Sequence, residues 1–358
     1  EEALSLVATK LQEMKEKYGA QSIGGLSSSR ATNEENYLFQ KWMRACIGTN
    51  HIDNGARLSS SSSLYGMMAS IGCGAMTHAM EDVAKADLIL LIGSDVYDDN
   101  LIFSHKMREA MRKNNAKIIL VDPRKTQWEK WANIWLRPLP GTDILWIYGL
   151  IRLLIEKGVY SKEFIGSKIE GFENLQSSLE KFSPGFVRKT TGISPEELEA
   201  VVNLYTAAKK RAIVFGSGVT QHVNGTETVK ALCNLALLTG EIDQGGGGVY
   251  PLLTQNNAQG ACDMGGLSEF LPGYQRVDDE KERKRFEEIW EREIPAKPGL
   301  TYMEMFDKIL EGKIKALYIF GEDPFIALPN LERLKNGLHQ LEFLVVQDLF
   351  MTHIGSYA

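Results

Sequence analysis

Polar residues directly follow several apolar stretches of the sequence, and their types could bind a ligand. Carboxylates accept hydrogen bonds from hydroxyl and amide groups, and glycine lets the backbone approach a ligand closely. Five segments share this pattern: Gly93-Ser94-Asp95, Asp122-Pro123-Arg124-Lys125, Gly216-Ser217-Gly218, Gly321-Glu322-Asp323-Pro324 and Asp348. A simple turn is the alternative for any one of them, because Gly and Asp are common turn residues. Five such segments in one chain favour a shared ligand-binding crevice.

A further segment, residues 254–266, is rich in side-chain amides and glycine. It includes Gln255, Asn256 and Asn257. Side-chain amides supply both donors and acceptors, which suits binding to the edge of a heterocycle. The alternative is that these amides cap turns and bond to nearby backbone.

Short runs rich in Val, Ile and Leu precede the polar segments and predict strands buried on both faces of a parallel sheet. The expected strands are residues 88–92, 117–121, 212–215, 316–320 and 343–347, and the expected helices are residues 101–113, 144–157, 195–209, 226–238 and 302–310. This alternation predicts an α/β doubly wound architecture. Ligands of such sheets lie beyond the carboxyl ends of the strands, where the polar segments would meet. The charged residues 279–293 predict a solvent-exposed helix.

The composition argues against several classes of function. Lys and Arg number 40 against 46 Asp and Glu, a net charge of −6, and no dense basic run is present to neutralise a nucleic-acid backbone. No stretch approaches the roughly 20 apolar residues of a membrane span. The four cysteines form no C-x-x-C pair, so their spacing indicates neither zinc nor an iron–sulfur cluster. We expect them to be buried thiols of a protein in a reducing, cytoplasmic location. Because residue 1 is Glu, we expect an internal or trimmed part of a longer chain.

Taken together, several segments resemble those of the molybdopterin oxidoreductases (the DMSO reductase superfamily), and most closely the formate dehydrogenase alpha subunits. The segments are Ser27–Tyr37, Gly72–Met76, Val121–Arg124, Gln255–Gly265, Gly321–Pro324 and Val346–Asp348. The chain is also similar to the large iron–sulfur subunit of NADH:quinone oxidoreductase.

The resemblance implies two interleaved αβα domains. One is discontinuous and incomplete, residues 1–54 with 256–358, and the other is dinucleotide-binding-like, residues 55–255. A strand near residues 22–26 would lie beside those ending at Gly321 and Asp348. The family also has an N-terminal iron–sulfur module and a C-terminal barrel, neither of which we expect within this chain.

The resemblance further implies a cofactor, two molybdopterin guanine dinucleotides around Mo or W, and partner subunits that carry iron–sulfur clusters. The implied contacts to one dinucleotide are Gly93, Ser94, Asp95 and Asp98 at phosphates and ribose, Asp122 and Arg124 near guanosine, and Gly141, Thr142 and Asp143 at its base. The implied contacts to the other pterin and nucleotide are Gly216, Gly218, Thr220, Gln221, Gln255, Asn256, Gly321, Glu322 and Asp323.

Three positions depart from the formate dehydrogenase pattern. In the formate enzymes a Cys or selenocysteine ligates the metal, the next residue is His, and an Arg holds formate; the corresponding residues here are Ser59, Ser60 and Leu253. Formate needs a cation, and its oxidation needs a base for the proton. A serine hydroxyl is not a base near neutral pH and a leucine cannot pair with a carboxylate. Repulsion of about 1 kcal/mol per charge between a diphosphate and Asp95, Asp98 or Asp99 would further weaken the pocket.

Three functions are compatible with these residues. The leading hypothesis is a subunit of a multisubunit electron-transfer oxidoreductase in which the formate chemistry is lost and the fold serves as a scaffold. The second is an active Mo or W enzyme that uses Ser59 as an alkoxide ligand for oxygen-atom transfer, although the run of serines at residues 59–63 could be an inert loop. The third is oxidation of formate to CO2 with unusual residues.

Overall fold

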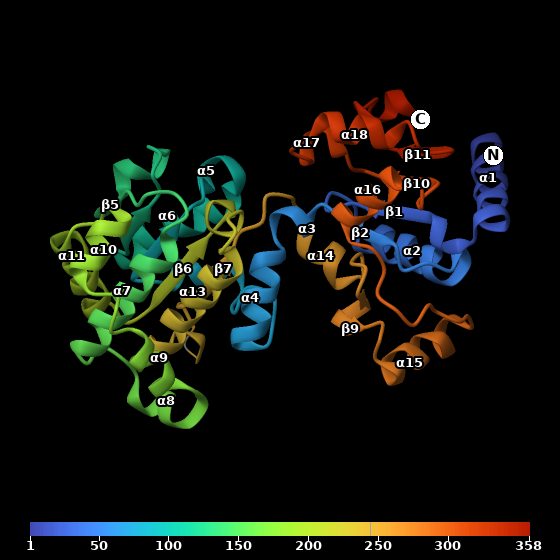
Figure 1. Ribbon diagram of the computed structural model, residues 1–358. Helices are drawn as coiled ribbons and strands as arrows, with labels where there is room; N and C mark the ends of the chain where they lie inside the picture. The colour runs from blue at the N-terminus through green and yellow to red at the C-terminus, as the bar shows by residue number, and fades with distance from the viewer. Residues whose placement is uncertain (244) are drawn as a thin grey trace. The chain divides into compact units, whose positions relative to one another are not determined.

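Five-residue apolar runs form the central strands of two parallel sheets, each in its own part of the chain. A computed structural model describes residues 1–243 and 245–358 (Figure 1). The described residues group into two units: a discontinuous unit, residues 1–58 with 255–358, and a continuous unit, residues 59–254.

The continuous unit contains a five-stranded parallel sheet with the strand order β5-β4-β3-β6-β7. Its strands are β3 (Leu88–Ile92), β4 (Lys117–Val121), β5 (Ile134–Leu136), β6 (Arg211–Phe215) and β7 (Gly248–Pro251). Its helices are α4 (Ser61–Ile71), α5 (Val96–Asp99), α6 (Leu101–Asn114), α7 (Asp143–Glu156), α8 (Lys162–Lys168), α9 (Phe172–Ser178), α10 (Pro184–Thr191), α11 (Pro195–Ala207), α12 (Ser217–Thr220) and α13 (Gly225–Thr239), with short 3-10 turns η3 (Met80–Lys85), η4 (Gln127–Trp131) and η5 (Glu241–Asp243).

Helices cover both faces of this sheet. Leu88, Leu90 and Ile92 of β3 belong to a core formed with α7, α11 and α13, whereas Ile89 and Leu91 belong to a second core formed with α6. Successive strand residues point to opposite faces, so a strand buried on both faces is apolar throughout. This arrangement confirms the predicted doubly wound architecture.

The order of the strands creates a switch point between β3 and β6. The chain builds outward from β3 through β4 to β5, then returns to add β6 and β7 on the other side of β3. The loops that follow β3 and β6 therefore leave the sheet in opposite directions and open a crevice at the carboxyl ends of the strands.

The discontinuous unit contains a four-stranded parallel sheet with the order β11-β10-β1-β2. Its strands are β1 (Ile23–Ser27), β2 (Ile52–Asn54), β10 (Ala316–Phe320) and β11 (Phe343–Gln347), and a small antiparallel pair is β8 (Phe270–Leu271) and β9 (Gln275–Arg276). Its helices are α1 (Glu2–Tyr18), α2 (Asn33–Trp42), α14 (Ala258–Asp263), α15 (Glu280–Trp290), α16 (Tyr302–Leu310), α17 (Pro324–Ala327) and α18 (Leu331–Leu338), with the π turn η2 (Met43–Ile47) and 3-10 turns η1 (Ala20–Ser22), η6 (Pro272–Tyr274) and η7 (Ile354–Tyr357). Helix α3 (Ala56–Ser59) crosses the border between the units.

The predicted elements agree with most of the central strands. The bounds of β3, β4, β10, β11 and α16 are those expected, and β6 begins one residue earlier than expected. The strand expected at residues 22–26 is Ile23–Ser27; it pairs with β10, and β10 separates it from β11. The exposed helix expected to reach residue 293 ends at Trp290. Among the described residues, no helix has both the length and the apolar character needed to cross a bilayer.

Candidate functional site

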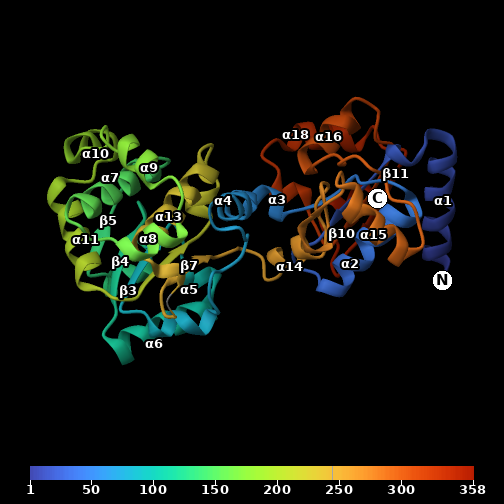
Figure 2. The same cartoon turned by 90° about the horizontal axis from the view of Figure 1, so that it is seen from below.

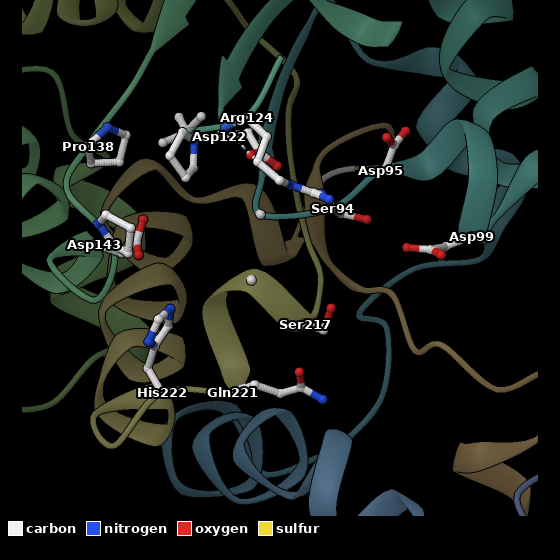
Figure 3. A pocket seen from close by; sticks show the side chains of 15 residues that line it. Ser94, Asp95, Asp99, Asp122, Arg124, Pro138, Asp143, Ser217, Gln221 and His222 are labelled. Carbon is white, nitrogen blue, oxygen red and sulfur yellow. Dashed lines mark hydrogen bonds and ion pairs between the residues drawn. The ribbon is translucent and has the colours of Figure 1, made fainter. Parts of the chain in front are cut away.

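A cavity of about 360 Å³ lies at the switch point of the continuous unit (Figure 3). It is lined by residues that follow three strands and by the loop before α7. The lining residues are Gly93, Ser94, Asp95, Asp99, Val121, Asp122, Pro123, Arg124, Pro138, Pro140, Asp143, Ser217, Gly218, Gln221 and His222. The structure therefore brings together the ends of β3, β4 and β6.

Bare backbone forms part of the wall of this pocket. The amide of Gly218 donates to the carbonyl oxygen of Gly93 over 2.9 Å, and Gly93 has a φ of 53°. A Cβ added to Gly218 would lie 2.8 Å from the Cα and the carbonyl oxygen of Gly93. Two glycines are therefore required here, one for the left-handed conformation and both for the close approach.

We expect Gly218→Ala to lower the free energy of unfolding by about 1–3 kcal/mol, because neither backbone can move away without disturbing its strand. Gly185→Ala is the matched control, because Gly185 lies in α10 with no neighbouring atom within 4 Å of an added Cβ. The control should stabilise the protein slightly, by up to about 1 kcal/mol. Thermal unfolding of both variants measures the difference in stability. Equal changes in melting temperature would contradict the close approach of Gly218 to Gly93.

Asp122 and Arg124 form the side of the pocket that follows β4. The Asp122 carboxylate is buried and accepts from the backbone amide of Arg124 over 2.8 Å, while the Arg124 Nε lies 3.5 Å from the same oxygen. The guanidinium of Arg124 remains mostly exposed and extends into the pocket toward Ser94 (Figure 3). Arg124 can therefore meet an anionic ligand without losing a buried contact.

Carboxylates occupy both sides of the cavity. Asp143 and His222 lie on one side, and Asp95 and Asp99 lie on the other (Figure 3). Burial raises the pKa of Asp143, an effect opposed by a hydrogen bond from the Trp146 indole and by the charge of His222. Burial also raises the pKa of Asp95, and the nearby carboxylate of Asp98 raises it further. Such a pocket favours ligand groups that donate hydrogen bonds, such as sugar hydroxyls and ring N–H groups.

Not every implied contact residue lines this cavity. Asp98 is exposed and lies outside the lining, where Asp99 takes part instead. Gly141 and Thr142 lie next to it, and the Gly141 carbonyl accepts from the Asn224 side chain over 3.2 Å. Gly216 packs against Ser94 behind the lining. Sequence reasoning did not identify His222 as a pocket residue, although it directly follows Gln221.

Residues 59 and 60 lie beside the same loop. The hydroxyls of Ser59 and Ser60 are 3.0 Å apart, and the Thr220 hydroxyl donates to the Ser59 carbonyl over 3.0 Å. Thr220 ends α12, whose residue Gly218 lines the pocket. Leu253 is half-buried and follows β7. Among the described residues, no group of three or more His, Cys, Asp or Glu side chains could hold a metal ion.

In the discontinuous unit, several implied contact residues have internal partners. The Asp323 carboxylate accepts from the backbone amides of Phe325 and His353, at 3.0 and 3.1 Å. The Gly321 carbonyl accepts from the Ser28 hydroxyl over 2.7 Å. Gln255 is half-buried and Asn256 is exposed. Their neighbour Asn257 uses its amide to donate to Ala31, which fits the turn-capping alternative at that residue.

Glu322 is buried at the carboxyl end of β10. Burial raises the pKa of its carboxyl to about 7, although the charge of Arg30 and the backbone amides of Gly55 and Ser29 oppose the shift. The Arg30 guanidinium lies 3.9 Å from the Glu322 carboxylate. A carboxyl with this pKa is protonated in part of the molecules near neutral pH, and in that form it can donate a hydrogen bond as well as accept one.

We expect Glu322 to make the protein less stable as the pH rises. The unfolded chain releases this proton near pH 4.5 and the folded chain near pH 7, so the folded state binds more protons between these values and stability falls across them by about 3 kcal/mol. Glu322→Gln removes this dependence and should gain stability over the unsubstituted protein at pH 8 but not at pH 5. Thermal unfolding at both pH values measures the effect, with exposed Glu332→Gln as control. If the stability of Glu322→Gln changed with pH in the same way as that of the unsubstituted protein, the raised pKa would not belong to Glu322.

Comparison with known proteins places the chain in a family. The model of the molybdopterin oxidoreductase family matches residues 1–358. The F420-dependent formate dehydrogenase subunit alpha of Methanocaldococcus jannaschii is 42% identical over 357 residues, which cover 99% of this chain and 52% of that protein. Formate dehydrogenase H of Escherichia coli is 39% identical over 360 residues, which cover 100% of this chain and 50% of that protein. The chain belongs to the molybdopterin oxidoreductase family and spans about half the length of these curated relatives.

A solved structure has the same fold. Acetylene hydratase from Pelobacter acetylenicus aligns over 100% of this chain and 51% of that chain, with a TM-score of 0.80 and 19% identity. At this identity the likeness shows the fold alone. The resemblance to formate dehydrogenase alpha subunits expected from the motifs is confirmed by the sequence relatives.

Proposed function

We propose that the chain is the central, cofactor-binding part of a formate-dehydrogenase-like subunit that keeps a nucleotide pocket but has lost the side chains for oxidising formate. The convergence of the ends of β3, β4 and β6 on one cavity supports this proposal most directly. We also propose that residues 1–54 with 256–358 and residues 55–255 are the two domains of this fragment.

The residues of the cavity fit the guanosine end of a molybdopterin guanine dinucleotide. Asp122 and Asp143 supply acceptors for ring N–H groups and ribose hydroxyls, and Arg124 supplies a cation for phosphate. The contact between Gly93 and Gly218 leaves backbone, with no side chain, along one wall. When bound, such a cofactor would supply a Mo or W centre for two-electron chemistry.

The residues implied at the metal do not fit formate oxidation. Ser59 offers a hydroxyl and Ser60 bonds to it, so neither supplies an imidazole that could take a proton. Leu253 offers no positive charge to a formate anion. We therefore assign this chain the role of cofactor binding and structural support, with Gln255, Asn256, Gly321, Glu322 and Asp323 contributing from the discontinuous unit.

Partners follow from the same proposal. A subunit without its own formate chemistry would act inside an assembly whose other subunits or modules carry iron–sulfur clusters. We propose a cytoplasmic location for that assembly, without nucleic acid, in line with the net charge of −6 and four free cysteines.

Metal and pterin analysis of the full-length protein from its natural source, combined with formate-dependent dye reduction, tests the proposed function. We expect guanine nucleotide in the acid extract and no dye reduction with formate. Dye reduction with formate would refute the loss of chemistry. Stoichiometric Mo or W with oxygen-atom transfer would instead support Ser59 as a metal ligand. Absence of both nucleotide and metal from this material would refute cofactor binding.

Arg124→Ala tests the pocket itself. Because the Arg124 side chain is 70% exposed, we expect its removal to leave the melting temperature unchanged. Loss of the cation should weaken GDP binding to cofactor-free protein about 10-fold. Isothermal titration with GDP measures this effect, and Lys125→Ala is the control because Lys125 is the exposed neighbour outside the cavity. If Arg124→Ala and Lys125→Ala bound GDP with equal affinity, Arg124 would not be a GDP-binding residue.

A further inference from the structure

Helix α6 carries a row of basic side chains along one exposed face, of which the two arginines are positively charged. His105, Arg108 and Arg112 follow helical spacing, and all three are exposed. They line a hollow of about 510 Å³ together with Glu109, Met111 and Trp131. Figure 2 shows α6 at the periphery of the continuous unit, on the outside of the sheet. The three side chains of the row are exposed, and none of them is among the residues that line the cavity at the switch point.

The two arginines of this row lack the ion pairs that other exposed helices form. In α15, by contrast, the charges pair along the helix, Lys284 with Glu280 and Arg283 with Glu287. In the part of the chain that the structure describes, neither Arg108 nor Arg112 has a carboxylate within 4 Å, because Glu109 pairs with the lysines of α6 instead. Two guanidinium groups one helical turn apart thus remain available to the carboxylates of another molecule.

An aromatic ring holds this positive surface in place. The Arg108 guanidinium lies 5.5 Å from the centroid of a Trp131 ring, and the Lys130 ammonium lies 4.2 Å from a ring of the same side chain. Trp131 in turn packs edge-on against the buried Trp128. These cation–π contacts restrict the basic side chains before any ligand arrives, which lowers the entropic cost of binding.

Basic side chains continue on the other flank of α6. Lys85, Lys106, Lys113 and Lys210 surround a second hollow of about 440 Å³ with Glu81 and Glu109. At the start of the helix, Leu101 and Ile102 are exposed. The whole face therefore combines excess positive charge with apolar side chains at one end, in a chain whose net charge is −6.

We propose that the outer face of α6, with Trp131 at its edge, docks an acidic polypeptide segment of a partner protein. Carboxylates match guanidinium groups in bidentate pairs, and those of a partner helix or strand repeat at a spacing close to one helical turn. A polypeptide is favoured over nucleic acid because the net negative charge repels a long polyanion, whereas a short acidic segment interacts only with the local row. The apolar residues Leu101 and Ile102 would pack against the apolar neighbours that such a segment carries.

The test measures binding of a fluorescein-labelled peptide of twelve glutamates to the full protein by anisotropy. We expect Arg108→Glu with Arg112→Glu to weaken binding at least 10-fold at low salt, and the affinity of the unsubstituted protein to fall as salt rises. Lys284→Glu, on the exposed face of α15, should leave the affinity within twofold. Arg108→Lys with Arg112→Lys keeps the charge but removes the bidentate donors, so its affinity should lie between those of the unsubstituted protein and the double-Glu variant.

The results of these measurements distinguish a polypeptide from nucleic acid and from lipid as the ligand of the α6 face. Equal affinity of the double-Glu variant and the unsubstituted protein would overturn the proposal, provided that circular dichroism shows both folded. Tighter binding of a dT12 oligonucleotide or of phosphatidylserine vesicles than of the peptide, lost in the same variant, would overturn the choice of a polypeptide. Protection of Arg108 and Arg112 from phenylglyoxal by the peptide would place the contact on α6.

Discussion

Formate-dependent dye reduction should rise at least about 100-fold when Ser59→Cys, Ser60→His and Leu253→Arg are combined in the cofactor-loaded full-length protein. A thiolate donates more strongly to a soft metal than a hydroxyl does, and an imidazole accepts a proton near neutral pH where a hydroxyl does not. A guanidinium can hold a carboxylate in two hydrogen bonds. A gain of 100-fold corresponds to about 2.7 kcal/mol, a modest requirement for three such groups.

The steady-state rate with formate and a viologen dye measures this gain. Ser61→Cys and Ser62→His combined with Leu253→Arg is the matched control, because it adds the same groups two residues further along the serine run. We expect no gain from the control. An unsubstituted protein that already oxidises formate at full metal loading, or a triple variant no faster than its control, would contradict the assignment of positions 59, 60 and 253.

Replacement of Arg44 by Leu should destabilise the discontinuous unit by about 3–5 kcal/mol. Arg44 is completely buried, and its guanidinium donates to the carbonyl oxygens of Gly265, Leu267 and Phe270 at 2.7–2.8 Å. It also bonds to the side chains of Gln40 and Asn50. Burial lowers the pKa of Arg44 to about 9, which is still high enough to keep the group charged at neutral pH.

Leucine fills much of the same volume but donates no hydrogen bonds, so three buried carbonyls would lose their partner. Urea unfolding followed by circular dichroism measures the loss of stability. Cys46→Ser, at an exposed position in the same turn of helix, should change the stability by less than about 0.5 kcal/mol. A comparable loss in both variants would show that the turn, and not the guanidinium, is sensitive to substitution.

The central strands could be predicted from the sequence because each places apolar side chains on two buried faces. β3 reads Leu-Ile-Leu-Leu-Ile without interruption, and its neighbours are similar. The edge strands β2, β5 and β7 were missed because three or four residues carry too little pattern to distinguish a strand from a loop. Their pairing depends on the strands beside them, which are distant in the sequence.

The site residues could be predicted by type but not by orientation. Asp122 and Asp323 both follow a strand, yet Asp122 lines a cavity while Asp323 bonds to the amide of His353, thirty residues later. No local pattern distinguishes these outcomes. The burial of Arg44 and the partial burial of Arg57 were not predicted, because charged residues are usually exposed and the partners Gly265 and Glu269 lie more than 200 residues away. The assignment of individual residues to cofactor contacts stays a prediction.

A single four-residue helix bears on two parts of the proposed function at once. Gly218 of α12 lines the cavity, and the hydroxyl of Thr220 in the same helix donates to the backbone carbonyl of Ser59. A ligand in the cavity would therefore contact the same short helix that holds the backbone carbonyl of residue 59. Thr220→Val would remove this hydroxyl and leave the Ser59 carbonyl without its hydrogen bond from α12.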